Sequence, residues 1–260
     1  MGLFSFFKKE KKSETSKNIL GMVLLEETNS MDIKKVVSEL REKWNLKVDD
    51  RESNNETSVL EIDGYKIAIA NMDVAIPGDE IETTAEYNYF WKKGKEEATK
   101  HKGHIILSIT NAGKDPIKEN LLYNKIASSV LNNSKSLGIY IGGRTLLLKK
   151  EFYQSVTNEI SEESLPLYNW IYLGIRKENE KNSMYTYGLS DFNKTEIEIL
   201  NSKHSVEEIN EMLTNFVNYI LISNVTLKDG ETIGFSEEQK LKISISKGKY
   251  IDGKTMKIEF

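Results

Sequence analysis

Short apolar runs alternate with helical stripes over the first 150 residues, and this order constrains the fold more than any other feature. The run from Ile19 to Leu25 is compact and ends at two glutamates, which is typical of a buried strand. The next apolar residues recur every three or four positions and indicate an amphipathic helix, with Asn29 or Ser30 as its N-cap. They are Ile33, Val36, Val37, Leu40 and Trp44.

Two further strands, a helix and a strand follow. Asp63-Gly64 separates the apolar runs 59–62 and 65–70, and this dipeptide predicts a tight hairpin between two strands. A capping-box pattern predicts a helix over residues 83–100, and a strand is expected over residues 104–110. Strand, helix, two strands, helix and strand is the split βαβ pattern of ferredoxin-like folds, so we expect that topology in an N-terminal lobe.

The chain as a whole is predicted to be α+β: a ferredoxin-like split βαβ N-terminal lobe, residues 18–150, followed by a second, mostly antiparallel α/β lobe, residues 166–260. Residues 1–17 are interpreted as a flexible tail. Residues 151–165 are acidic and weakly patterned, so they are interpreted as the linker. In the second lobe a capping box at Ser205-Val206-Glu207-Glu208 predicts a helix between strand-like runs.

Composition excludes several functional classes. The chain has no cysteine, so it can form no disulfide, thiolate metal site or cysteine nucleophile, and a reducing cytoplasm is the expected compartment. The net charge is −4, with no basic field suited to nucleic acid. No apolar run approaches the roughly 20 residues of a transmembrane helix.

The first twelve residues place an apolar cluster ahead of a basic one. This order argues against a signal peptide, in which the basic residues come first. The alternatives are a flexible or self-docked tail and a weak, reversible contact with an anionic membrane surface. The residues concerned are Leu3, Phe4, Phe6 and Phe7, followed by Lys8, Lys9, Lys11 and Lys12.

Two histidines separated by two residues suggest a metal site. Glu97, His101 and His104 could hold zinc if all three side chains faced one point. His101, however, is expected to close a helix and His104 to open a strand, so the rings need not converge. We therefore predict structural roles for both histidines, and no metal or cofactor.

An acidic segment extends from Asp73 to Glu86 with no lysine or arginine inside it. Clustered carboxylates can serve acid–base chemistry, collect a divalent cation or contact a basic partner. Because Pro77-Gly78 indicates a loop, the expected role is an exposed surface, with partner contact as the first alternative. The partner-contact candidates are Asp79, Glu80, Glu82 and Glu86.

The segment Gly142-Gly143-Arg144-Thr145 is compatible with an anion-cradling loop. No helix is expected after it, and such loops hold phosphate at a helix N-terminus. A bend between two strands is the preferred interpretation.

The C-terminal part resembles a known family. The residues concerned are Leu165-Pro166, Trp170, the run Tyr185 to Leu189, Phe192, Glu196, Glu198 and the run Asp229 to Gly234. Together they resemble the bacterial family catalogued as domain of unknown function 4261, from about Ala85 to Lys247 and best from Pro166 onward, with Trp91 and the segment His101 to His104 similar to the region that often precedes it. Asn193 stands where family members tend to have glycine. The resemblance implies a compact α/β domain and no assigned activity.

Three functions remain open. The leading hypothesis is a non-enzymatic protein-interaction module of the accessory or immunity type, because no catalytic pattern stands out. The first alternative is a hydrolase or metal-assisted enzyme that uses the His101/His104 region or the carboxylates near Asp79. The second alternative is a peripheral membrane protein held by the N-terminal tail.

Overall fold

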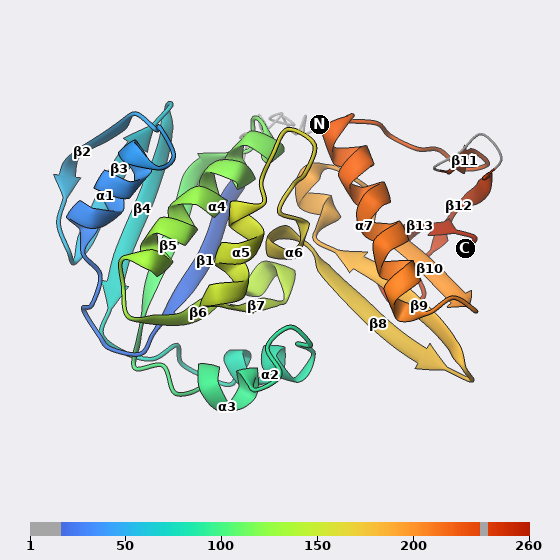
Figure 1. Ribbon diagram of the computed structural model, residues 1–260, viewed down its shortest axis with the longest axis horizontal. Coiled ribbons are helices and arrows are strands. Elements are labelled where there is room, and N and C mark those ends of the chain that lie inside the picture. The colour runs from blue at the N-terminus through green and yellow to red at the C-terminus, as the bar shows by residue number, and fades with distance from the viewer. Residues whose placement is uncertain (1–16, 235–238) are drawn as a thin grey trace, which may run out of the picture.

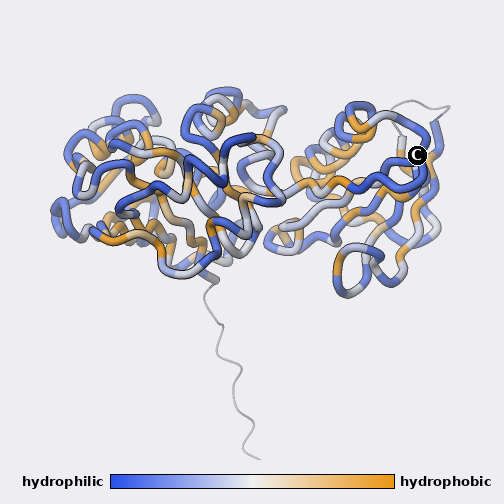
Figure 2. Tube along the Cα trace, turned by 90° about the horizontal axis from the view of Figure 1, so that it is seen from below, coloured by the Kyte–Doolittle hydropathy of each residue, from blue (hydrophilic) through white to orange (hydrophobic). Residues whose placement is uncertain are grey.

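The structure is a computed structural model that describes residues 17–234 and 239–260. These residues form two lobes, each built on its own sheet (Figure 1). Figure 2 shows the lobes side by side along the long axis. The fold is α+β, as predicted.

Seven antiparallel strands of the described chain form the first sheet, in the order β2-β3-β4-β5-β1-β6-β7. Their bounds are β1 Lys17–Leu25, β2 Val48–Ser53, β3 Thr57–Ile62, β4 Tyr65–Met72, β5 Gly103–Ala112, β6 Ser136–Ile141 and β7 Leu146–Lys149. Alternate residues of β1 face opposite sides, so Val23 and Leu25 enter one core while Leu24 enters another. The sheet is therefore covered on both faces, at least in part.

Helices of unequal size cover the two faces. The helices α1 Ile33–Glu42, α4 Pro116–Asn132 and α5 Lys150–Asn158 lie on the larger core (Figure 1). The short helices α2 Glu80–Glu86 and α3 Gly94–Ala98 pack on the opposite face against Leu24 and Tyr140. Because α2 and α3 are short, part of that face remains open to solvent.

The second sheet has the order β11-β12-β13-β10-β9-β8 among the residues described, and only the pair β10 and β13 is parallel. The strands are β8 Tyr172–Glu178, β9 Lys181–Tyr187, β10 Ile197–Ser202, β11 Thr232–Ile233, β12 Leu241–Lys247 and β13 Lys254–Ile258. Helix α7 Val206–Ile222 packs its apolar stripe on one face of this sheet. The short helix α6 Leu167–Trp170 connects the lobes.

The predicted features that depend only on local backbone geometry are confirmed in two places and wrong in a third. Asp63 and Gly64 both have positive φ, as the two-residue hairpin between β3 and β4 requires. Both hydrogen bonds of the Ser205/Glu208 capping box are present at the start of α7. Helix α1 is capped by Asp32, however, and neither Asn29 nor Ser30 is its N-cap.

The ferredoxin-like topology is not found. That topology would place β1 between β4 and the later strand, but β5 lies between β4 and β1. Strand β5 fits the sheet centre because it is apolar on both faces. The helix predicted over residues 83–100 is also wrong, because Asn88 accepts hydrogen bonds from the N–H groups of Phe90 and Trp91 and separates α2 from α3.

The segment expected to be a linker, residues 151–165, contains most of helix α5. Tyr153 of this helix is fully buried in the first core, and Thr157 is buried beside it. Asn169 of α6 donates to the backbone oxygen of Tyr153 and to Oδ1 of Asn124, at 3.0 and 3.1 Å. A buried polar network thus fixes the connection to the first lobe. No helix within the described ranges is long and apolar enough to cross a membrane.

Candidate functional site

Both histidines of the candidate metal site hold the same backbone segment. Nε2 of His101 accepts the N–H of Ile76 at 2.8 Å, and its Nδ1–H donates to the oxygen of Ala98 at 2.7 Å. His104 donates from Nδ1 to the oxygen of Val74 at 2.9 Å. Since a backbone N–H can only donate, Nε2 of His101 carries no proton and the imidazole is neutral. Burial lowers the pKa of this histidine, which favours the neutral form. These contacts fix the chain between β4 and α2.

Glu97 does not join the histidines. Its Oε2 accepts the indole N–H of Trp91 at 2.7 Å and lies 3.5 Å from Nζ of Lys149. The Trp91 hydrogen bond, followed by the nearby Lys149, lowers the pKa of Glu97. In the part of the chain that the structure describes, no group of three His, Cys, Asp or Glu could hold a metal ion.

The acidic candidates point in different directions. Asp79 precedes helix α2 without a side-chain cap bond, and Glu82 is exposed. Glu86 pairs with Lys95 at 2.9 Å in an exposed contact. Glu80 alone of these four lines a hollow, where its Oε2 accepts the hydroxyl of Tyr140 at 3.1 Å. The apolar and basic residues from Leu3 to Lys12 lie outside the described residues.

The junction between the lobes brings together side chains from distant parts of the sequence. Arg144, in the 3₁₀ turn Gly142–Arg144 between β6 and β7, is 5% exposed. Its Nε donates to Oδ2 of Asp191 in the second lobe at 2.7 Å, and its guanidinium lies 5.4 Å from the ring centre of Phe192. The predicted bend is therefore also a contact between lobes.

Two adjoining hollows meet at Arg144. One has a volume of about 580 Å³ and is lined by the start of β1, Glu80, Tyr140 and the turn Gly142–Arg144. The other, of about 370 Å³, is lined by Glu119 and Asn120 of α4 together with Asn193. Asn18, Ile19, Arg144 and Asp191 line both. Hollows of this size at a domain junction are typical of ligand sites.

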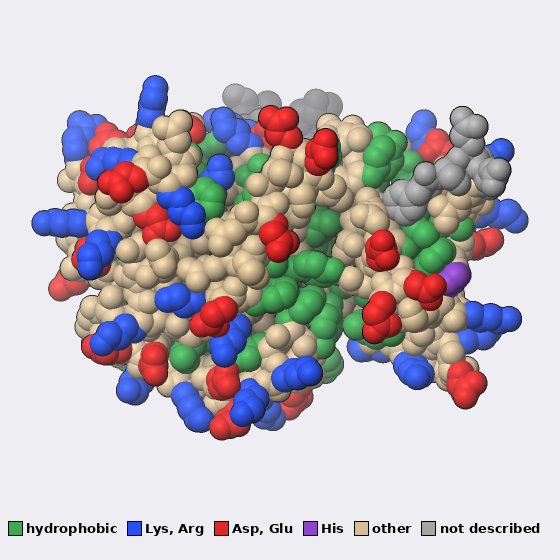
Figure 3. Space-filling view, in the orientation of Figure 1, with side chains coloured by type: hydrophobic (Ala, Val, Ile, Leu, Met, Phe, Trp, Pro, Cys, Tyr) green, Lys and Arg blue, Asp and Glu red, His purple; other side chains and the backbone are tan. Residues whose placement is uncertain are grey.

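Aromatic side chains also join the two lobes. Tyr89 donates its hydroxyl to the oxygen of Leu173 at 2.8 Å, and Tyr172 donates to the oxygen of Tyr87 at 3.1 Å. Burial raises the pKa of Tyr172 to about 12 and that of Tyr89 further. Figure 3 shows apolar side chains gathered on this face around α5, α6 and the start of β8. These contacts make the junction a packed interface.

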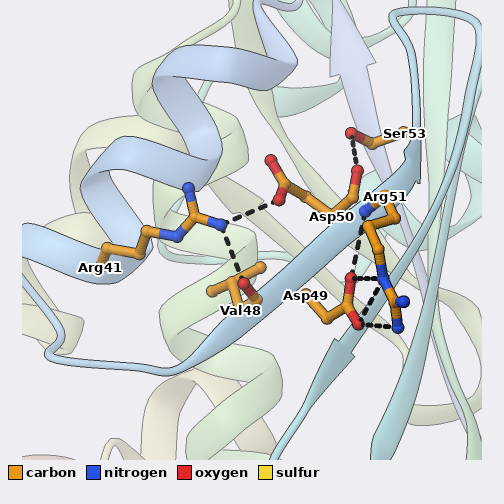
Figure 4. A network of polar contacts seen from close by, with 6 residues as sticks. All are labelled: Arg41, Val48, Asp49, Asp50, Arg51 and Ser53. Carbon is orange, nitrogen blue, oxygen red and sulfur yellow. Dashed lines mark hydrogen bonds and ion pairs between the residues drawn. The ribbon is translucent and has the colours of Figure 1, made fainter.

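The outer edge of the first lobe carries another hollow, of about 620 Å³, and two of the charged residues that line it, Arg41 and Asp49, are paired. Arg41 donates to the oxygen of Val48 and to Asp50, and Arg51 forms a two-pronged contact with Asp49 (Figure 4). The hydrogen bond from Arg51 lowers the pKa of Asp49. Lys47, Glu61 and Asp63 also line this hollow and form no ion pair within the described residues, so acidic and basic charges are mixed there.

Two buried glutamates of the second lobe hold turns together. Glu196 accepts hydrogen bonds from Thr186 and from the N–H groups of Gly188 and Ser190. Glu198 is fully buried and accepts from Thr255, from the N–H groups of Lys249 and Tyr250, and from Lys257 at 3.2 Å. Burial alone would raise the pKa of Glu198, but these hydrogen bonds outweigh burial and lower it.

The two glutamates also fall within a family match. Residues 185–259 match the family model Domain of unknown function (DUF4261). The DUF4261 match extends from β9 to beyond β13 and confirms the resemblance over the C-terminal third, while Trp91 and the His101–His104 segment lie outside it. No curated protein and no solved structure matches the chain. Because Glu196 and Glu198 fix turns, these two residues of the DUF4261 pattern support the fold.

Sequence reasoning found the Arg144 turn but not its importance. A buried arginine can be recognised only when its partner is known, and Asp191 is distant in the sequence. The glycines before Arg144 indicated a turn correctly. No local pattern indicated that the turn would face a second lobe.

Proposed function

We propose that this chain is a non-enzymatic protein-interaction module of the bacterial cytosol, of the accessory or immunity type. The supporting observation is a strip of apolar side chains on the open face of the first sheet. Leu20, Val59 and Met72 are 47%, 41% and 37% exposed there. Exposed apolar patches of this kind mark interaction sites in folded proteins.

Strand register places these side chains on one surface. Val59 pairs with Ala68, Ala68 with Ser108, and Ser108 with Leu20, in one row across four adjacent strands. In the parallel row, Ala70, Ile106 and Met22 are half-buried. Met72 pairs with His104 and lies on the same face. We call this surface, from Val59 and Met72 to Leu20, the open-face strip.

The acidic segment borders the open-face strip. It begins directly after Met72, and Glu80 lines the same hollow as Leu20 and Met22. Asp79, Glu80 and Glu82 are exposed. A partner with an apolar patch and a basic rim would complement both features, since opposite charges at a rim steer association and fix orientation.

Co-purification with the products of neighbouring genes tests this proposal. We expect the wild-type chain to retain one of them, and the double variant Val59→Thr/Met72→Gln to lose it while keeping the same thermal midpoint. Tyr219→Gln is the matched control, because Tyr219 is equally exposed but lies on α7. Retention of the same partner by the double variant would overturn the open-face strip as the docking surface.

A further inference from the structure

Arg144 carries more hydrogen-bonding capacity than its surroundings use. A guanidinium has five N–H donors. The side chain of Arg144 donates from Nε to Asp191, whereas neither terminal nitrogen, Nη1 nor Nη2, donates to any residue in the described ranges. Neither terminal nitrogen is among the buried side-chain atoms of the described residues that lack a partner, so these donors reach the open space of the hollows that Arg144 lines. They are therefore available to a ligand there.

The contact with Asp191 leaves the terminal nitrogens available. Asp191 meets Nε through one oxygen, and its side chain is 50% exposed. The four N–H groups of Nη1 and Nη2 remain, and the side chain that carries them lines both junction hollows. The contact with Asp191 of the second lobe thus holds Arg144 in place, while the terminal nitrogens of its guanidinium face the open space of the hollows.

A second buried polar group lines the smaller hollow. Asn120 is 2% exposed, and its Nδ2 donates to the oxygen of Pro116 at 2.8 Å. Its Oδ1 accepts no hydrogen bond from any residue described. The terminal nitrogens of Arg144 and the unsatisfied Oδ1 of Asn120 therefore belong to side chains that line the same junction hollow, and both residues come from the first lobe.

The residues that line the larger hollow determine which kind of anion can bind at Arg144. Ile19, Leu20 and Met22 make one side of the larger hollow apolar, and Glu80 and Asp191 place two carboxylates on its rim. These carboxylates repel a multiply charged anion, whereas a singly charged carboxylate can still form two parallel hydrogen bonds with a guanidinium fork. We infer that the Arg144 hollow binds the carboxylate of a small organic acid whose remainder is apolar.

This site adjoins the proposed docking strip, because Leu20 and Met22 belong to both. Val59 and Met72, at the other end of the strip, line neither hollow at Arg144, so variants of these two residues test the docking strip alone. The acid would bind to Arg144, which belongs to the first lobe, close to Asp191 of the second lobe.

An NMR titration with hexanoate tests the inference. We expect saturable shifts of the Arg144 Nε–H signal and of the Gly142 and Gly143 amides. Hexanamide, which has the same chain without the charge, should leave these signals in place, and inorganic phosphate should bind more weakly than hexanoate. Equal shifts with hexanoate and hexanamide, or tighter binding of phosphate, would refute a monocarboxylate site.

Two variants locate the binding. Arg144→Lys should abolish the hexanoate response, because lysine lacks the planar fork. Gly143→Leu keeps Arg144 intact: a Cβ at this position meets no atom within 4 Å, so leucine has room and narrows the hollow. We expect it to weaken hexanoate binding by about tenfold or more, equivalent to 1.4 kcal/mol.

An exposed arginine supplies the control. Arg176→Lys should bind hexanoate as the wild type does, because Arg176 lies on the exposed strand β8 of the second lobe. If Arg144→Lys proves too unstable to study, Gly143→Leu decides the question alone. Unchanged affinity in Gly143→Leu would place the bound acid elsewhere and overturn the assignment.

Discussion

Carboxylate side chains have opposite roles in two regions, the acidic segment of the first lobe and the pair Glu196 and Glu198 at the start of β10. Asp79, Glu82 and Glu86 are close in sequence and exposed, and they share no common contact. Glu196 and Glu198 are an isolated pair, yet each is buried and collects several hydrogen bonds. The density of carboxylates along a sequence therefore says little about which of them the fold depends on. What matters is how many donors converge on each one.

Glu198→Ala should give the largest effect. The substitution leaves the amides of Lys249 and Tyr250 and the hydroxyl of Thr255 without their acceptor, and it removes the carboxylate partner of Lys257, which keeps its bond to the oxygen of Lys247. Breaking a buried, charge-assisted network of this kind destabilises a protein by about 3–5 kcal/mol. Urea denaturation followed through tryptophan fluorescence measures it, because Trp170 is buried in the second core.

Glu211→Ala is the control for Glu198, since Glu211 is exposed on α7 and should change the free energy of unfolding by no more than about 0.5 kcal/mol. A similar loss in both variants would remove the distinction between buried and exposed glutamates.

His101→Phe should come second. The N–H of Ile76 loses its acceptor, which costs about 1–3 kcal/mol for a buried donor. The wild type should also lose stability as pH falls below about 6.5, which is the pKa of an unfolded histidine. In that range the unfolded chain binds a proton at residue 101, whereas folded His101 stays neutral because its pKa is lowered, so protonation favours the unfolded state. Thermal melts from pH 7.5 to 5 would show this slope.

The slope assigned to His101 should be absent from His101→Phe and retained in His204→Gln, because His204 is exposed and stacks on Phe260 at 4.1 Å. If both variants keep the slope of the wild type, another group is responsible for it.

Glu82→Gln should have the smallest effect. The side chain is exposed, and no hydrogen bond or ion pair joins it to another residue in the described part of the chain, so the free energy of unfolding should change by no more than about 0.5 kcal/mol. Chemical denaturation under the conditions used for Glu198→Ala provides the direct comparison. A loss of several kcal/mol would mean that the acidic segment also supports the fold.

Sequence patterns predicted those parts of the structure that are fixed locally. Asp63-Gly64 and the Ser205/Glu208 box determine their own backbone hydrogen bonds, so both were found correctly. Strand order depends on contacts between distant segments, and the expected ferredoxin-like order was wrong because β5 lies between β4 and β1. Likewise the carboxylates of the acidic segment were visible in the sequence, whereas the burial of Arg144 depends on a residue of the other lobe.

The central position of β1 has a consequence for synthesis. Its two neighbours, β5 and β6, are made much later, and β6 ends only at Ile141. During synthesis β1 must therefore wait, with its apolar side chains unpaired, until the chain has been made as far as Ile141. Such a delay exposes the nascent chain to aggregation and makes it a natural client for chaperones.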